Sequence, residues 1–197
     1  MTLTKCFDAA FPPAQAPDGC GAVLGYIGRP GPGRLDRDEH PWTLEEWLRF
    51  GHIRQFPCWV TDFSKDPRAS AADAVHLARA LGWNSGRAIV FDTEDLVDRP
   101  WCVVFAAEIE GYYFTPVNYG SASVVARNGC GWLWLAKWDG DPQLEDGQGV
   151  EAHQYVAGVT VPGGIVDFSV VSDDLLHHGG RGPRHWAVPY NLHNLLT

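Results

Sequence analysis

The segment that most constrains the fold is residues 88–95, in which an apolar run ends directly in acidic residues. The run is short, contains β-branched residues and follows Gly86, a pattern typical of a buried strand rather than a helix. Because alternate side chains of a strand share a face, Asp92 and Glu94 are expected to point the same way. Two carboxyls at the end of a hydrophobic strand are costly unless water, a substrate or chemistry requires them. The segment therefore predicts a strand that ends in a functional site.

The first two thirds of the chain alternate between strand and helix patterns. Strands are expected at residues 4–7, 22–27, 55–60, 88–91 and 114–118. Thr43 and Glu46 form a capping box that opens a helix at 44–52. Another helix is expected to begin after Ser70 and to end before Gly82, and two more at 100–110 and 122–127. This alternation predicts a parallel sheet with helices outside it.

The last strands, at residues 131–136, 150–155 and 164–168, have no helix pattern between them. The link 157–163 is too short for a parallel crossover, and the acidic link 139–149 is a poor helix. Both links are therefore expected to be hairpin-like, so that strand 150–155 runs antiparallel to its neighbours. This direction would put Asp167 at the rim that holds Asp92 and Glu94, and Gln154 and Tyr155 at the opposite end.

Eight strands with helices only among the early ones predict an α/β, TIM-like barrel with reduced helices. The expected type is (β/α)5β3 with one antiparallel strand, since 197 residues are too few for the roughly 250 of a full barrel. The barrel is assigned to residues 1–170. Residues 171–197 are expected to form a C-terminal tail packed on its outside through Trp186, Tyr190 and Leu192.

Chemistry in such barrels is carried by the carboxyl ends of the strands. The residues at or just after these ends are Asp8, Arg29, Asp62, Asp92, Glu94, Tyr119, Trp134, Trp138 and Asp167. A structural ion pair with Arg29 or Lys137 is the alternative for the Asp92 and Glu94 carboxyls. Loop capping is the alternative for Asp8 and Asp167. Trp134 also fits a wall or core position, whereas Trp138 lies beyond its strand and is the better platform for a sugar ring.

In this order of residues the chain resembles glycoside hydrolase family 25, the Chalaropsis-type lysozymes or N-acetylmuramidases. The family pattern is an Asp that ends the first strand, an Asp-x-Glu that ends the fourth, a Tyr after the fifth, a Leu-Trp-x-Ala strand, a Gln-Tyr strand and a last Asp. The chain carries Asp8, Asp92 with Glu94, Tyr119, Leu133-Trp134-Leu135-Ala136, Gln154-Tyr155 and Asp167. Its Phe7-Asp8-Ala9 start is similar to a related actinobacterial and phage glycoside-hydrolase-like domain, formerly of unknown function.

Two segments depart from the muramidase pattern. Asp8 is followed by Ala9-Ala10-Phe11-Pro12-Pro13 instead of a Ser and a Gln-Gly element, and the second strand ends in Tyr26-Ile27-Gly28-Arg29-Pro30. The acids match the family, while the walls of its substrate groove do not.

The resemblance implies a peptidoglycan-directed glycoside hydrolase, an endolysin or virion-associated lysin that cleaves a glycosidic bond by acid catalysis. Glu94, Asp92, Asp8 and Asp167 would be catalytic, with Glu94 as general acid and its proton held by burial and like-charge repulsion. Arg29, Asp62, Tyr119, Trp134 and Trp138 would contact substrate. The alternative is a carbohydrate-binding barrel with little or no turnover, acting as a structural, envelope or virion protein.

Composition excludes several other classes. The formal net charge of −9 argues against nucleic-acid and anionic-membrane partners, and no apolar stretch is long enough to span a membrane. Five scattered cysteines show no zinc spacing and are interpreted as free thiols; no motif calls for a metal or cofactor. Residues 1–5 lack the features of a secretory signal. The protein is therefore expected to be made in the cytoplasm and to reach the cell wall by release or within a phage particle.

Overall fold

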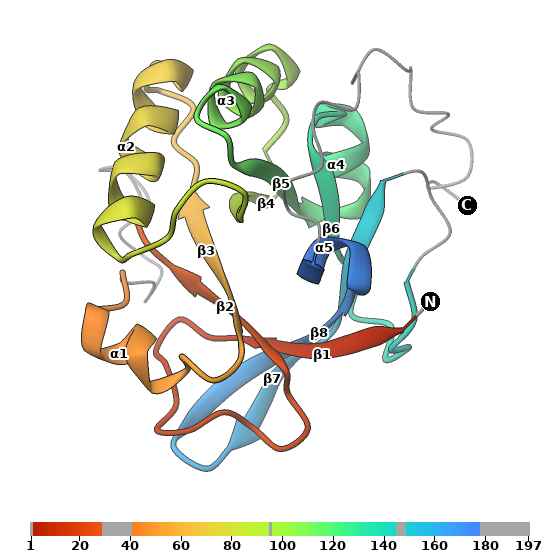
Figure 1. The fold of residues 1–197 in the computed structure, drawn as a ribbon. Helices are drawn as coiled ribbons and strands as arrows, with labels where there is room; N and C mark the ends of the chain where they lie inside the picture. Colours follow the sequence, from red (N-terminus) through yellow and green to blue (C-terminus); the bar gives the residue numbers. More distant parts are fainter. Residues whose placement is uncertain (1, 29–40, 95, 145–148, 178–197) are drawn as a thin grey trace.

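The computed structural model describes residues 2–28, 41–94, 96–144 and 149–177 (Figure 1). Two expectations fall outside these residues: the substrate contact assigned to Arg29, and the tail contacts assigned to Trp186, Tyr190 and Leu192. Within the described part of the chain, no helix is long and apolar enough to cross a membrane.

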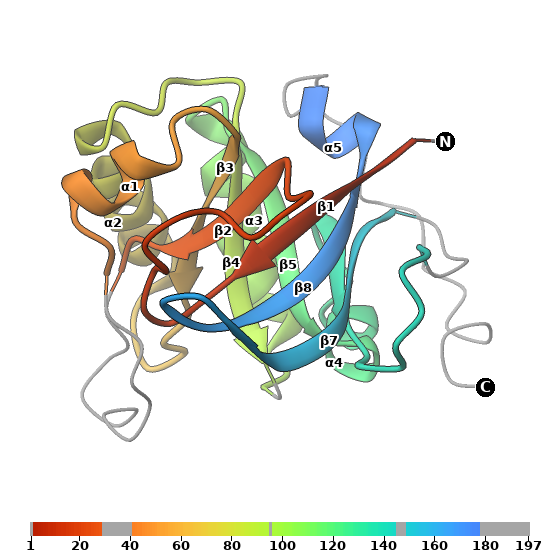
Figure 2. The same ribbon diagram turned by 90° about the horizontal axis from the view of Figure 1, so that it is seen from below.

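Eight strands close into one barrel in the order of the chain. Figures 1 and 2 show how these strands are arranged. Seven of them run parallel, and one runs against its two neighbours. The strands are β1 Leu3–Asp8, β2 Ala22–Tyr26, β3 Arg54–Val60, β4 Ala88–Glu94, β5 Thr115–Ser121, β6 Trp132–Ala136, β7 Val150–Val161 and β8 Gly164–Ser172. This confirms the predicted TIM-like barrel with reduced helices and one antiparallel strand.

The antiparallel strand is β8 and not, as predicted, β7. β7 runs parallel to β6, while β8 runs antiparallel to both β7 and β1. The link 137–149 reaches the dozen residues that a parallel crossover needs, although those of its residues that the structure describes, 137–144 and 149, form no helix. The segment predicted to be the second link, 157–163, instead extends β7 to Val161 and turns directly into β8 at Gly164. The predicted hairpin between β7 and β8 is therefore confirmed, whereas the predicted hairpin between β6 and β7 is wrong.

The helices cover only part of the barrel. α2 (Pro67–Ala80), α3 (Arg99–Gly111) and α4 (Ala122–Asn128) lie along the outside of β3 to β6, while α1 (Leu44–Arg49) follows β2 and α5 (Asp173–His177) follows β8 (Figure 1). The capping box predicted at Thr43 and Glu46 is present. α2 begins earlier than expected, because the Asp66 carboxylate accepts hydrogen bonds from two backbone N–H groups of its first turn.

Three apolar clusters stabilise this arrangement. The first lies inside the barrel and includes Cys6, Phe56, Val90 and Trp134. The second lies between the strands and the surrounding helices, and a small third one joins Val125 of α4 to residues of β6 and β7. Inward-facing residues therefore occupy alternate positions of each strand. The same alternation carries Asp8, Tyr119 and Gln154 into the barrel at its carboxyl-end mouth.

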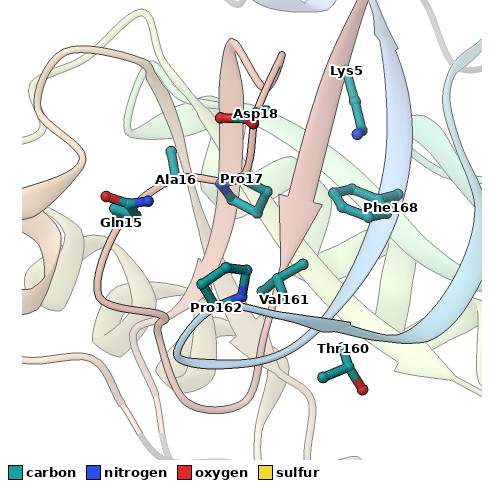
Figure 3. A pocket seen from close by; sticks show the side chains of 9 residues that line it. All are labelled: Lys5, Gln15, Ala16, Pro17, Asp18, Thr160, Val161, Pro162 and Phe168. Atoms are coloured by element: carbon teal, nitrogen blue, oxygen red, sulfur yellow. The ribbon is translucent and has the colours of Figure 1, made fainter.

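On the side formed by β1, β7 and β8, the described helix that packs on the strands is the short α5 at the end of β8 (Figure 2). There the β7–β8 turn packs against the β1–β2 loop, and Gly163 approaches the backbone of Ala14 closely. A cavity of about 280 Å³ lies between these loops (Figure 3). The Lys5 ammonium forms its wall together with Phe168, whose ring centroid is 3.9 Å away. Because both side chains face outward, this cavity is separate from the mouth of the barrel.

Candidate functional site

Asp8 and Asp167 form a carboxyl pair at the mouth of the barrel. They stand opposite each other in the antiparallel register of β1 and β8. Asp8 is almost fully buried, while Asp167 is partly exposed and accepts a hydrogen bond of 2.6 Å from the Gly158 N–H. Asp167 is thus at the rim where the sequence placed it, although it belongs to the first half of its strand and not to the end.

Gln154 connects the carboxyl pair to two aromatic side chains. Its Nε2 donates to Asp8 at 3.0 Å and to Asp167 at 3.3 Å. Its Oε1 accepts from the Tyr119 hydroxyl at 2.9 Å and from the Trp138 indole at 2.7 Å. The amide of this fully buried residue therefore uses both donors and both lone pairs. The expectation that Gln154 lies at the opposite end is wrong, because β7 runs parallel to β6.

The carboxyl pair retains protons more strongly than isolated aspartates do. Burial, and then the charge of Asp167, raise the pKa of Asp8 well above its usual value, and the Gln154 hydrogen bond offsets part of this shift. Burial also raises the pKa of Asp167. The pKa of the Tyr119 hydroxyl is raised by burial and by the charges of Asp8, Asp92 and Asp167. The phenol is therefore neutral and lies among three carboxyls.

Asp92 and Glu94 complete the acidic mouth, but not by simple alternation. A bulge interrupts the pairing of β4 with β5 between these two residues. Glu94 has a left-handed backbone with φ of 44°, and its N–H donates to the Asp92 carboxylate at 2.9 Å. The Asp92 side chain is buried, while Glu94 is half-buried. The regular alternation is thus interrupted between Asp92 and Glu94, and the backbone N–H of Glu94 holds the Asp92 carboxylate.

Buried hydrogen bonds hold this bulge in place. The N–H and hydroxyl of Thr61 both donate to the Asp92 carbonyl, at 3.1 and 2.6 Å. The Thr93 hydroxyl donates to the Tyr119 carbonyl and accepts from the side-chain amides of Asn118 and Asn128. A left-handed non-glycine residue costs about 1–3 kcal/mol and persists only where surrounding contacts impose it. These contacts meet that requirement and put the strain at the residue predicted to be catalytic.

Gly120 leaves room for this turn. A Cβ built on Gly120 would lie 2.8 Å from the Glu94 carbonyl oxygen. Sequence reasoning overlooked Gly120, Thr61, Thr93, Asn118 and Asn128. Thr93 stands between the two acids and Asn118 directly before Tyr119, so their positions were a usable signal.

The remaining predicted contact residues occupy different environments. Trp138 is 65% exposed beside the mouth and is free to present its ring to a ligand. Asp62 follows β3 and accepts hydrogen bonds from the N–H and hydroxyl of Ser64, which is a loop-capping role. Trp134 is fully buried, packs on Phe56 and donates its indole N–H to Ser169. Its assignment to substrate contact is therefore corrected to a core position, because it has no exposed surface.

No protein-family model and no curated protein matches the sequence. Solved structures do match. An uncharacterized *B. stearothermophilus* protein aligns with a TM-score of 0.67 at 18% identity, covering 88% of this chain and 98% of that one. A Tat-secreted *Mycobacterium tuberculosis* protein in complex with L-tartrate aligns with a TM-score of 0.65 at 17% identity, covering 94% and 100%. A glycosyl hydrolase 25 of *Streptococcus pneumoniae* aligns with a TM-score of 0.64 at 10% identity, covering 91% and 94%. The chain therefore has the fold of the family 25 glycosyl hydrolases, which confirms the resemblance noted in its sequence.

Proposed function

We propose that the protein is a glycoside hydrolase that cleaves glycosidic bonds in the glycan strands of peptidoglycan. The observation that carries this proposal is the gathering of four carboxyls from β1, β4 and β8 at one barrel mouth, beside an exposed Trp138. The modular autolysin LytC of *Streptococcus pneumoniae*, solved with a synthetic peptidoglycan ligand, shares the fold with a TM-score of 0.54, and supports this choice of substrate. Action at the cell wall, after release or within a phage particle, is part of the same proposal.

Glu94 is proposed as the general acid. Glu94 and Asp167 are the two half-buried carboxyls of the group, and Glu94 is the last residue of β4, where the backbone is left-handed. A carboxyl at this position would protonate the leaving oxygen of a sugar bound across the mouth.

Asp92 would stabilise the positive charge that develops on the sugar ring, or orient an N-acetyl group. Its carboxylate accepts the Glu94 N–H and is held in one orientation by that contact. Asp8 and Asp167, bound through Gln154, would form the floor of the site and bind sugar hydroxyls.

Replacement of Glu94 by Gln tests the catalytic role. Positioned acids contribute about 10²–10⁴-fold to rate, so the release of reducing ends from purified peptidoglycan should fall by about that factor in E94Q. Circular dichroism and thermal denaturation should show an intact fold.

A matched control is E45Q, which makes the same change at an exposed residue of α1 and should retain full activity. Equal activity of E94Q and the native chain would contradict the assignment of Glu94. Glycan binding by the native chain without any release of reducing ends over long incubation would reject hydrolysis in favour of a carbohydrate-binding barrel.

A further inference from the structure

A second charged pocket lies at the end of the barrel opposite the acidic mouth. It has a volume of about 510 Å³ and is formed where β1 to β4 begin and where β8 passes into α5. Its polar side chains include Thr4, His52, Arg54, Arg87 and His177. No Asp or Glu of the described residues lines it. The ionisable side chains that line this pocket are therefore all basic, although the chain as a whole has a net charge of −9.

The two arginines of this pocket lack the carboxylate partners that a partly buried guanidinium group ordinarily has. The Nε of Arg54 is buried without a hydrogen-bond partner. Within the described part of the chain, the ion pairs involve other residues, and neither Arg54 nor Arg87 forms one. Burial and the charge of Arg87 lower the pKa of Arg54. The two cations therefore repel each other, and none of the described residues that line the pocket supplies a compensating negative charge.

This arrangement is hard to explain as a device for stability. The amino-terminal face of such barrels ordinarily serves stability, yet a buried donor without an acceptor costs about 1–3 kcal/mol. An anion between the two guanidinium groups would supply the missing acceptor and remove the repulsion.

We propose that this Arg54–Arg87 pocket binds a terminal phosphate group, as carried by a phosphomonoester. A phosphate dianion offers two charges and three free oxygens to donors that surround it. Arg54, Arg87 and the two imidazoles reach the pocket from three separate segments: β3 with the loop before it, the loop before β4, and α5. A carboxylate, with one charge and two oxygens, would be satisfied by a single guanidinium. The site is separate from the acidic mouth and does not depend on its activity.

Thermal denaturation of the full chain with inorganic phosphate tests the proposal. A ligand that binds only the native state raises the denaturation midpoint with concentration. The midpoint should rise with phosphate and exceed the value in sodium chloride of equal ionic strength. R54Q and R87Q should lose this rise, and titration calorimetry should show affinity for phosphate lower by about tenfold or more. R127Q, which removes an exposed arginine of α4, should behave like the native chain.

Other probes decide the chemical class. Glycerol 3-phosphate should bind like inorganic phosphate, while acetate and dimethyl phosphate should bind at least tenfold more weakly. Equal binding of dimethyl phosphate or acetate would overturn the assignment to a terminal phosphate. Because R87Q removes a repulsion, it should be at least as stable as the native chain in phosphate-free buffer. A native chain that responds to phosphate no more than to chloride, or a response that survives in both R54Q and R87Q, would overturn the site.

Discussion

Asp8 and Asp167 face each other across the antiparallel pair of β1 and β8, and one amide, that of Gln154, donates to both carboxyls. This contact links β8, which runs antiparallel to both of its neighbours, to β1 at the mouth of the barrel. It also brings two carboxyl groups close together, of which Asp8 is buried and Asp167 is partly buried. The pair therefore affects the stability of the protein as well as its chemistry.

Replacement of Asp8 by Asn should stabilise the protein at neutral pH. The pKa of Asp8 is raised in the folded state, while in the unfolded chain it is about 3.9. Between these two values the native state holds a proton that the unfolded state has lost, so the free energy of unfolding falls as pH rises through this range. Each unit of raised pKa contributes about 1.4 kcal/mol to that fall. In D8N the dependence on pH should be flatter, as measured by urea denaturation from pH 4 to 8.

D73N is the control for this prediction, because Asp73 lies exposed on α2. Its dependence of stability on pH should match that of the native chain. The idea of a proton held at the carboxyl pair would be rejected if D8N lost stability at neutral pH as steeply as the native chain does.

The sequence predicted the barrel well because its signals are local. The apolar runs, the capping box at Thr43 and the left-handed Gly82 each depend on neighbouring residues. The direction of β7 depends instead on whether the link between β6 and β7 can pass back along the barrel, and neither composition nor periodicity records this. Because this direction was predicted wrongly, the hydrogen bond between Gln154 and Asp8, which lie 146 positions apart in the sequence, was not predicted either.

The candidate site was predicted as a set of acids, without the contacts that hold them. Asp8, Asp92, Glu94 and Asp167 come together at one mouth because strand ends of a closed barrel must meet. The bulge at Glu94 was missed, because regular alternation was assumed and a bulge has no consistent sequence signature. Trp134 was assigned to substrate contact with a wall or core position as the alternative, and the packing around it decides for the core.

Replacement of Gly120 by Ala should displace Glu94 without touching its side chain. The added Cβ would lie 2.8 Å from the Glu94 carbonyl oxygen, and the φ of 157° at Gly120 disfavours any side chain. The backbone of Glu94 must shift to relieve this contact. We expect a loss of stability of about 1–3 kcal/mol and a marked fall in the release of reducing ends.

G111A is the matched control, since a Cβ at Gly111 meets no atom within 4 Å and lies at the end of α3. It should leave activity unchanged and stability equal or slightly higher. Full activity in G120A would show that the position of Glu94 is unimportant for the reaction.

Trp138 is predicted to bind sugar rings through its face. The side chain is 65% exposed, and its indole N–H donates to Gln154, which fixes the ring beside the mouth. Covering a large apolar side chain contributes about 1.5–3 kcal/mol, so W138A should weaken glycan binding by about ten- to a hundred-fold. W138F keeps an aromatic face without the N–H and should retain most of the affinity.

Titration calorimetry of soluble peptidoglycan fragments, with each substitution made in the E94Q background, measures these affinities without turnover. L48A, which removes an exposed apolar side chain from α1, should not alter them. Equal losses in W138F and W138A would assign the effect to the hydrogen bond with Gln154, and unchanged affinity in W138A would exclude the ring from the binding site.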